Sequence, residues 1–248
     1  MSIETRIHHR KPSVKRNGIR TNRSSFARLS PLFLGCFFFV GCGDEPQTEV
    51  PPTELTSIAE ARALPLGKVA KVEGFVTVEP GTFASATGEV GFALQDDTAG
   101  LYVRLDEPLQ AAVGAHVRVE GTLGDMSKLT TLISDPTRVD VLSGSSVLAP
   151  KDVKTGEVNE STEGLLVRVA GKVTKALVDD RPYGMKVYVD DGSGEVQIFV
   201  HLVGADATPL IDTSKLGVDQ AVEVTGFSMQ YETTYEISPR AAADLVLK

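Results

Sequence analysis

The sequence predicts an all-β protein made of two tandem small barrels, and three observations lead to this prediction. After residue 65, valine, threonine and isoleucine alternate with polar residues, as in strands that have one buried face. Clusters of glycine, aspartate and proline separate these runs, as expected of turns. The second half of the chain also repeats the pattern of the first half, so one structural unit is predicted to occur twice.

A basic leader precedes the body. Residues 1–41 hold eight basic residues and one acidic residue, and they end in an apolar run of about ten residues at 32–41. That run is shorter than the roughly 20 residues that a membrane-spanning helix needs, and it is typical of the apolar part of an export signal. A buried helix is the weaker alternative, because glycines interrupt the run and its phenylalanines lack amphipathic spacing.

The segment FVGC at 39–42 resembles the lipobox of bacterial lipoproteins. The resemblance implies that residues 1–41 are a lipoprotein signal peptide and that Cys42 is lipidated and becomes the mature N-terminus. Residues 42–56 are acidic and rich in proline, and they are predicted to form a tether. We therefore expect a protein of the cell envelope that is lipid-anchored to a bacterial membrane, on the periplasmic side or the outer surface.

Each copy of the repeat is predicted to contain five strands. A possible capping box at Ser57 and Glu60 opens a short helix before the first copy. In each copy a long first strand is followed by a second strand, a tight Asp-rich turn, a third strand, a connector of weak helical character and two further strands. The aligned segments are 69–77 with 166–174, 92–103 with 187–198, and 117–121 with 222–226.

The alternation keeps the same inward face in both copies, which indicates a closed barrel. Val72, Gly74 and Val76 share one face of the first strand, and the glycine suits a sharp bend between two sheets, as does Gly171 in the second copy. Five strands with one connector between the third and the fourth predict a Greek-key OB-fold barrel. We place the two barrels at 57–143 and 155–248, with a linker at 144–154.

The runs SIAEARALPLGKVAKVEGFVT, FALQDDTAGLYVRL and VGAHVRVEGTL, and KTGEVNESTEGLLVRVAGKVT in the second copy, resemble OB-fold domains of secreted bacterial proteins. These include OB-fold domains attached to extracellular sugar-non-specific nucleases. The resemblance implies the barrel fold and, by analogy, a binding role. We expect no accompanying catalytic domain, because the two copies occupy the body of the chain.

Net charge makes duplex DNA an unlikely partner. The chain carries −8 in total, but the residues after the leader hold 17 basic and 32 acidic residues, a net charge of −15. Proteins that grip duplex DNA neutralise its phosphates with lysine and arginine.

Catalysis, metals and cofactors are not expected. The acidic pairs at 96–97 and 190–191 could ligate Ca²⁺, but they lack the spacing of an EF-hand loop, and turn residues are the favoured interpretation. His116 and His201 lie in different copies, and no Ser-His-Asp arrangement or phosphate loop is found. We therefore predict a protein that is not an enzyme.

The outer face of the second and third strands is the candidate ligand site, as is common in OB-folds. Tyr188 and Phe199 could stack bases or rings there. The other candidate residues on or beside this face are His201, Lys186, Lys172, Arg168, Tyr102 and Arg104. The favoured interpretation, however, is that these aromatic residues pack against the other barrel or the connecting loops. Of the two copies, the second offers the better ligand site. Phe227 and Met229 are predicted to form a contact between the barrels.

Taken together, the sequence predicts a non-catalytic, membrane-anchored lipoprotein whose OB-folds bind or scaffold an extended ligand or an envelope protein. Single-stranded nucleic acid is the alternative ligand, and its weakness is the acidic body. Oligosaccharide remains open, although the chain has no tryptophan, the commonest stacking platform for sugars. The sequence leaves the oligomeric state open.

Overall fold

The computed structural model describes residues 53–204 and 206–248, which fall within one compact unit, Val50–Lys248. The predicted signal peptide, Cys42 and most of the predicted tether lie outside the described residues. Within the described part, no helix is both long enough and apolar enough to cross a membrane.

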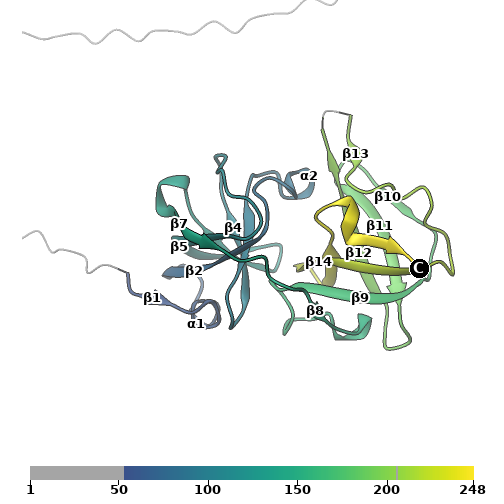
Figure 1. Ribbon diagram of the computed structural model, residues 1–248, viewed down its shortest axis with the longest axis horizontal. Helices are drawn as coiled ribbons and strands as arrows, with labels where there is room; N and C mark the ends of the chain where they lie inside the picture. The colour runs from purple at the N-terminus through teal and green to yellow at the C-terminus, as the bar shows by residue number, and fades with distance from the viewer. Residues whose placement is uncertain (1–52, 205) are drawn as a thin grey trace, which may run out of the picture. The chain divides into compact units, whose positions relative to one another are not determined.

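The first barrel, which contains β2, β4 and β5 in Figure 1, closes through five strands. Their order is β2-β3-β4-β6-β5, with β5 pairing back onto β2. All of these pairings are antiparallel except β4–β6, which is parallel. Its elements are β1 (Leu55–Thr56), α1 (Ile58–Arg62), β2 (Val69–Val78), α2 (Ala84–Thr87), β3 (Phe92–Gln95), β4 (Gly100–Arg104), β5 (Ala115–Met126), β6 (Leu129–Ile133), η1 (Pro136–Arg138) and β7 (Val139–Ser145).

The second barrel repeats this order as β9-β11-β12-β15-β14, with β11 pairing onto β9 and β12 lying parallel to β15. Its elements are β8 (Lys151–Asp152), η2 (Thr155–Glu157), β9 (Leu166–Val173), β10 (Val178–Asp180), β11 (Gly184–Asp190), β12 (Val196–Val203), β13 (Thr208–Pro209), β14 (Ala221–Tyr231), β15 (Thr234–Ser238), η3 (Ala242–Asp244) and β16 (Leu245–Leu247). The predicted fold class, two tandem five-stranded Greek-key OB-fold barrels, is confirmed.

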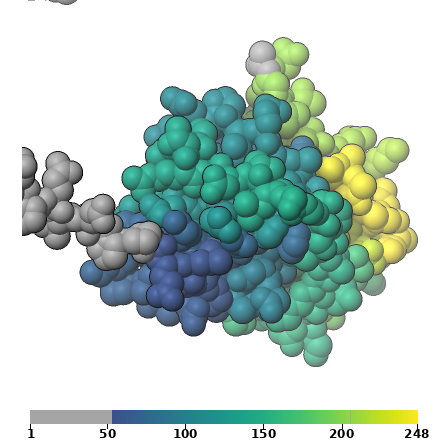
Figure 2. Space-filling view, turned by 60° about the vertical axis from the view of Figure 1, so that its left-hand side comes forward, coloured from purple at the N-terminus to yellow at the C-terminus, as the bar shows by residue number. Residues whose placement is uncertain are grey.

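Each copy carries extra strands beyond the five. β1 and β8 lie parallel to β2 and β9, and β7 and β16 add to the outer edges of β5 and β14. The last of these, β16, is on the surface, in the yellow region of Figure 2.

Glycine sits where the long first strand changes partners, as predicted. β2 pairs with β5 up to Phe75 and with β3 from Phe75 onward. A Cβ at Gly74 would lie 2.9 Å from the carbonyl oxygen of Gln95, and one at Gly171 would lie 2.7 Å from that of Asp190. A larger residue would push the two strands apart at the bend.

The two cores follow the predicted alternation. The first contains Val72, Val76, Phe92 and Leu101, and the second contains Val169, Val187 and Ile198; all are at most 2% exposed. Side chains on the inward face therefore fill each barrel, so a ligand site has to be sought among the side chains of the outward faces.

The connectors differ from the prediction. Residues 105–114, between β4 and β5, contain no helix, and Pro108 within this ten-residue segment cannot donate a helical hydrogen bond. Residues 206–220 of the second copy also hold no helix; the segment there contributes β13, which pairs with β12. The predicted helical character of this connector is wrong. The short helix α2 instead lies between β2 and β3.

The predicted helix at Ser57 is confirmed as α1. The Ser57 hydroxyl accepts a hydrogen bond from the Glu60 amide, and the Glu60 carboxylate accepts one from the Ser57 amide, which completes the capping box. The carboxylate of Asp96 accepts the Ile58 amide at 2.8 Å and so fixes the helix to the β3–β4 turn.

Candidate functional site

The outward face of β3 and β4 in the first barrel is buried under the second barrel. A cluster of side chains from both barrels fills this contact: Val78, Phe83, Ala93, Tyr102, Leu129, Phe227 and Met229. The Phe227 ring lies 6.0 Å from the Tyr102 ring and 6.1 Å from the Phe83 ring. The predicted contact through Phe227 and Met229 is confirmed.

Tyr102 is consequently not an accessible ligand residue. It lies outside the core of its barrel, as predicted, but the other barrel buries it, which was the favoured interpretation for these aromatic residues. It is 1% exposed, and its hydroxyl donates to Glu89 Oε1 at 2.8 Å. Burial raises the pKa of the Tyr102 hydroxyl above its usual range. The physical reason is that strand alternation tells which side chains leave the barrel core, but a second domain can still cover them.

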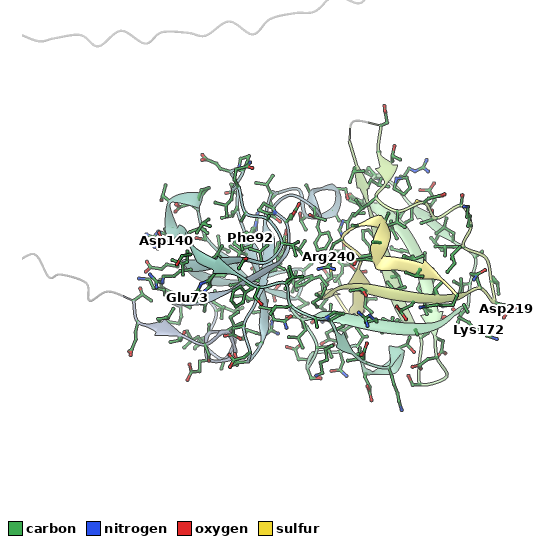
Figure 3. The ribbon with its side chains drawn as sticks, viewed as in Figure 1. Glu73, Phe92, Asp140, Lys172, Asp219 and Arg240 are labelled. Carbon is green, nitrogen blue, oxygen red and sulfur yellow. The ribbon has the colours of Figure 1, made fainter. Side chains whose placement is uncertain are left out.

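Backbone contacts and buried polar bonds join the barrels further. Gly100 and Gly164 approach so closely that a Cβ on Gly100 would lie 1.8 Å from the Gly164 carbonyl oxygen. Arg62 Nη2 pairs with Glu163 Oε1 at 2.9 Å. Arg240, labelled in Figure 3, donates from Nη1 to the Thr77 carbonyl oxygen at 2.9 Å. These bonds satisfy polar groups that the contact removes from water.

His201 belongs to this contact: it lies outside the core of the second barrel, as predicted, but the first barrel buries it fully, so it is not an accessible ligand residue. Its ring stacks on Phe83 at 4.4 Å and meets Phe199 edge-on at 5.0 Å. Its ring nitrogens lie 3.3 Å from Ser85 Oγ and 3.2 Å from Ser238 Oγ. Burial lowers the pKa of His201 to about 3, so the ring is neutral at physiological pH.

The Ser85 hydroxyl is hydrogen-bonded to two backbone groups of the second barrel. It donates to the Tyr183 carbonyl oxygen at 2.8 Å and accepts the Leu202 amide at 3.1 Å. α2 of the first barrel is thereby fastened to β12 of the second, with His201 beneath it.

Beside this contact, part of the outward face of the second barrel remains open as a cleft of about 430 Å³. β11 and β12 form its floor through Lys186, Gln197 and the edge of Phe199, which is 5% exposed. α2 and the β5–β6 turn of the first barrel contribute to its wall. The other lining residues are Ala86, Thr87, Met126, Ser127, Asp180, Tyr183, Met229, Gln230, Tyr231 and Glu236.

A buried carboxyl group, Glu236 on β15, lies in this cleft. It is 4% exposed and accepts a hydrogen bond from Gln197 Nε2 through Oε2. Burial raises the pKa of Glu236 to about 7, against the opposing effects of the Gln197 hydrogen bond and the Lys186 charge. Lys186 itself pairs with Asp180 at 2.9 Å, which raises the pKa of the lysine.

Sequence reasoning named Lys186 and Phe199 but missed Glu236 and Asp180. The missed signal for Glu236 was the OB-fold strand order. It places β15 next to β12, and the inward-facing Ile237 then puts Glu236 on the same outward face as Gln197.

The remaining candidate residues lie outside the cleft. Tyr188 is half-buried beneath Lys175, whose Nζ is 4.4 Å from the ring centroid. Arg168 pairs with Asp152 at 3.5 Å. Lys172 is exposed at the end of β9 far from Arg240 (Figure 3), and Arg104 is half-buried on β4 of the first barrel.

The two acidic pairs are turn residues, as favoured from the sequence. Asp96 Oδ1 accepts the amides of Thr98 and Ala99 at 2.8 Å each. Asp191 Oδ1 accepts the Ser193 amide at 2.9 Å and the Thr155 hydroxyl at 2.8 Å. These hydrogen bonds lower the pKa of both carboxyl groups. Among the described residues, no three histidine, cysteine, aspartate or glutamate side chains are grouped as a metal site would require.

Comparison with known proteins gives structural likeness alone. No family model matches the chain, and no curated protein matches it. Among solved structures, the OBody AM1L10 bound to hen egg-white lysozyme is 22% identical, with a TM-score of 0.32, over 42% of this chain and 98% of that one. A murine DNA-binding protein bound with double-stranded DNA is 12% identical, with a TM-score of 0.39, over 72% and 94%. The Ifi202 HINa domain in complex with 20-base-pair DNA is 11% identical, with a TM-score of 0.34, over 74% and 96%. The OB-fold class rests on the strand order of the chain itself.

Proposed function

We propose that this chain is a non-catalytic binding module of the bacterial cell envelope, anchored to a membrane through lipid on Cys42, and that it binds its partner through the cleft of the second barrel. One observation carries the binding part of the proposal. The outward faces of the two barrels differ in accessibility. Phe227 covers that of the first barrel, whereas that of the second stays partly open over Lys186 and Gln197.

The described polar groups support binding over catalysis. The serine hydroxyl next to His201 is held by two backbone groups, and the histidine has no charge partner among the described residues. A general base needs access to a substrate proton, and His201 has no exposed surface.

Anchoring rests on the sequence of the leader. The lipobox-like FVGC and the proline-rich stretch after it suit a lipoprotein whose folded part stands off the membrane. Two or more acyl chains give stable anchoring. In the full chain, Cys42→Ala is expected to move the protein from the membrane fraction to the soluble fraction; retention in the membrane fraction would contradict lipidation there.

Single-stranded nucleic acid is the second candidate, and Tyr188 is the observation that favours it. A half-buried ring with Lys175 above it is the kind of platform on which bases stack. Its weakness is charge pairing. Lys175 is paired with Glu195, Lys186 with Asp180 and Arg168 with Asp152, so these cations do not form a continuous positive groove.

Site-specific photocrosslinking in bacterial cells tests the proposal. A photoreactive side chain in place of Tyr183, which is 53% exposed and lines the cleft, is expected to give one discrete crosslinked envelope protein. The control is Val147, which is 76% exposed and does not line the cleft. Equal products at both positions, or none at Tyr183, would contradict binding in the cleft.

An oligonucleotide titration separates the two candidates. We expect the full chain in detergent to show no saturable binding of a labelled single-stranded oligonucleotide, even at low salt. Binding that weakens steeply with salt and is lost in Tyr188→Ala would favour the nucleic-acid candidate.

A further inference from the structure

The charges that line the cleft do not balance when Glu236 is ionised. Lys186 is the one cation among its described lining residues, and it is already paired with Asp180 at 2.9 Å. The carboxylate of Glu236 is therefore left without a cationic partner of its own. A partly enclosed site with one extra carboxylate attracts a cation and repels phosphate.

One carboxylate oxygen of Glu236 has no hydrogen-bond partner in the described chain. Its Oε2 is held by Gln197, whereas Oε1 makes no hydrogen bond among the described residues. The side chain is 4% exposed and lines the cleft. A carboxylate oxygen that lines a cleft and has no protein partner can accept a charged hydrogen bond from a donor that a ligand brings.

The walls suit a long aliphatic stem that ends in a charge. Tyr183, Tyr231 and Phe199 present aromatic surface, and Met126 and Met229 present flexible apolar surface. Aromatic faces attract cations, and methionines adapt to irregular apolar groups. Lysine and arginine side chains combine such a stem with a cationic end.

The edge of the sheet beside the cleft suits an extended peptide. β10 ends the strand order of the second sheet, and it carries Asp180 into the cleft. Its outer edge pairs with no other strand of the described chain, so its backbone groups are available to a peptide that adds as a strand.

We propose that the cleft receives a lysine or arginine side chain from an extended segment of a partner protein, with the carboxylate of Glu236 as the acceptor of the cationic group. This inference rests on the proposed function, because it names the chemistry of the partner that the cleft binds.

Binding is expected to strengthen as the pH rises. The groups that face Glu236 are Lys186 and Asp180, with the hydroxyls of Tyr183 and Tyr231 at the cleft wall; the first barrel contributes uncharged residues there. With a pKa of about 7, Glu236 is about one-tenth ionised at pH 6 and about nine-tenths ionised at pH 8. The dissociation constant is therefore expected to fall roughly tenfold over this range.

Fluorescence anisotropy of labelled, end-capped pentapeptides tests the inference, with the full chain in a non-ionic detergent. The peptide GGKGG is expected to bind saturably, and GGEGG and GGQGG at least tenfold more weakly. Butylamine, offered as a competitor, is expected to compete more weakly than unlabelled GGKGG, because it lacks the backbone that β10 would pair with. Equal binding of GGEGG, or equal competition by butylamine, would overturn the proposal.

Two variants and a matched control locate the acceptor. Glu236→Gln keeps the shape of the side chain and is expected to weaken GGKGG binding at pH 8 about tenfold and to abolish the pH dependence. Asp180→Asn, on an edge strand where folding is little disturbed, is expected to weaken binding as well. Asp140→Asn makes the same charge change on β7 of the first barrel (Figure 3) and is expected to change nothing. Wild-type binding by Glu236→Gln at pH 8 would overturn the proposal.

Failure of this inference is distinguishable from failure of the proposed function. A crosslinked partner at Tyr183 whose yield Glu236→Gln does not change would leave the binding module standing and refute the cationic acceptor. If the photoreactive side chain at position 183 gives no crosslinked product in a chain that keeps Glu236, both proposals are refuted.

Discussion

The outward face of β3 and β4 and the corresponding face of β11 and β12 come from the same repeat, yet the structure uses them differently. In the first barrel this face presents Ala93 and Tyr102, and Phe227 and Met229 cover it. In the second it presents Lys186 and Gln197, which remain at the floor of a cleft. The apolar face of the first barrel forms the contact between the barrels around Phe227, which we call the joint. The mixed polar and aromatic face of the second barrel stays partly open.

The contrast also shows why two barrels form one unit. The outward face of the first barrel is covered in this contact, and α2 of the first barrel forms part of the wall of the cleft in the second barrel. A tandem repeat thus leaves this face open in the second barrel alone.

The largest expected effect on stability comes from a substitution in the joint itself. Phe227→Ala removes a fully buried ring that contacts Phe83 and Tyr102, and it is expected to lower the free energy of unfolding by about 3–5 kcal/mol. Tyr231→Ala, on the same strand but 59% exposed, is expected to cost less than about 1 kcal/mol. Urea unfolding of both variants measures the difference, and similar costs would mean that the joint is not closed.

The glycine contact between the barrels gives a smaller effect. Gly100→Ala places a Cβ against the Gly164 carbonyl oxygen, and the forced separation is expected to cost about 1–3 kcal/mol. Gly217→Ala is the control, because its Cβ would meet no atom within 4 Å. Unchanged stability of Gly100→Ala in urea unfolding would show that the barrels do not approach each other there.

Two buried titratable groups, one in the joint and one in the cleft, are expected to act on stability with opposite signs. His201 binds its proton in the unfolded chain at a pKa near 6.5 but in the folded chain only near 3, so its contribution is present above pH 6.5 and is lost as the pH falls toward 3. Glu236 has its pKa raised from 4.5 to about 7, so its contribution is present below pH 4.5 and is lost as the pH rises toward 7.

Between pH 5 and 6 the two slopes, each about 1.4 kcal/mol per pH unit, largely cancel in the wild-type chain. His201→Gln is expected to leave a chain that loses stability from pH 5 to 6, and Glu236→Gln one that gains stability. Urea unfolding at the two pH values measures both slopes. The same slope in both variants would show that at least one of these groups is accessible to water.

The smallest expected effect concerns the Asp-rich turn, a feature that both barrels have. Asp96→Ala removes the bonds to the Ile58, Thr98 and Ala99 amides and is expected to cost about 1 kcal/mol. Asp97→Ala changes an exposed neighbour and is expected to stay within about 0.5 kcal/mol. Thermal unfolding measures both, and added Ca²⁺ is expected to shift neither; stabilisation by Ca²⁺ would contradict the turn interpretation.

The sequence was sufficient for the barrels because their signals are local. The alternation around Val72 and Val76, the glycine bends and the Asp-rich turns each depend on neighbouring residues. The predicted helical connector was the exception. Pro108 cannot donate a helical hydrogen bond, and residues 105–114 are too few to form a helix around it.

The site was predicted less well because it depends on contacts between distant residues. Alternation placed Tyr102 and His201 outside the barrel cores correctly, but it could not show that the other barrel buries them. Glu236 was missed because its place in the cleft follows from the parallel pairing of β15 with β12, which joins segments about 40 residues apart.

Thiol labelling of the two equivalent faces tests the central contrast most directly. In a chain with both natural cysteines replaced by serine, a single cysteine is introduced as Ala93→Cys on the closed face or as Gln197→Cys on the open face. A maleimide reagent is expected to label Gln197→Cys in the native protein and to label Ala93→Cys only after unfolding in urea. Rapid native labelling of Ala93→Cys, or protection of both positions, would contradict it.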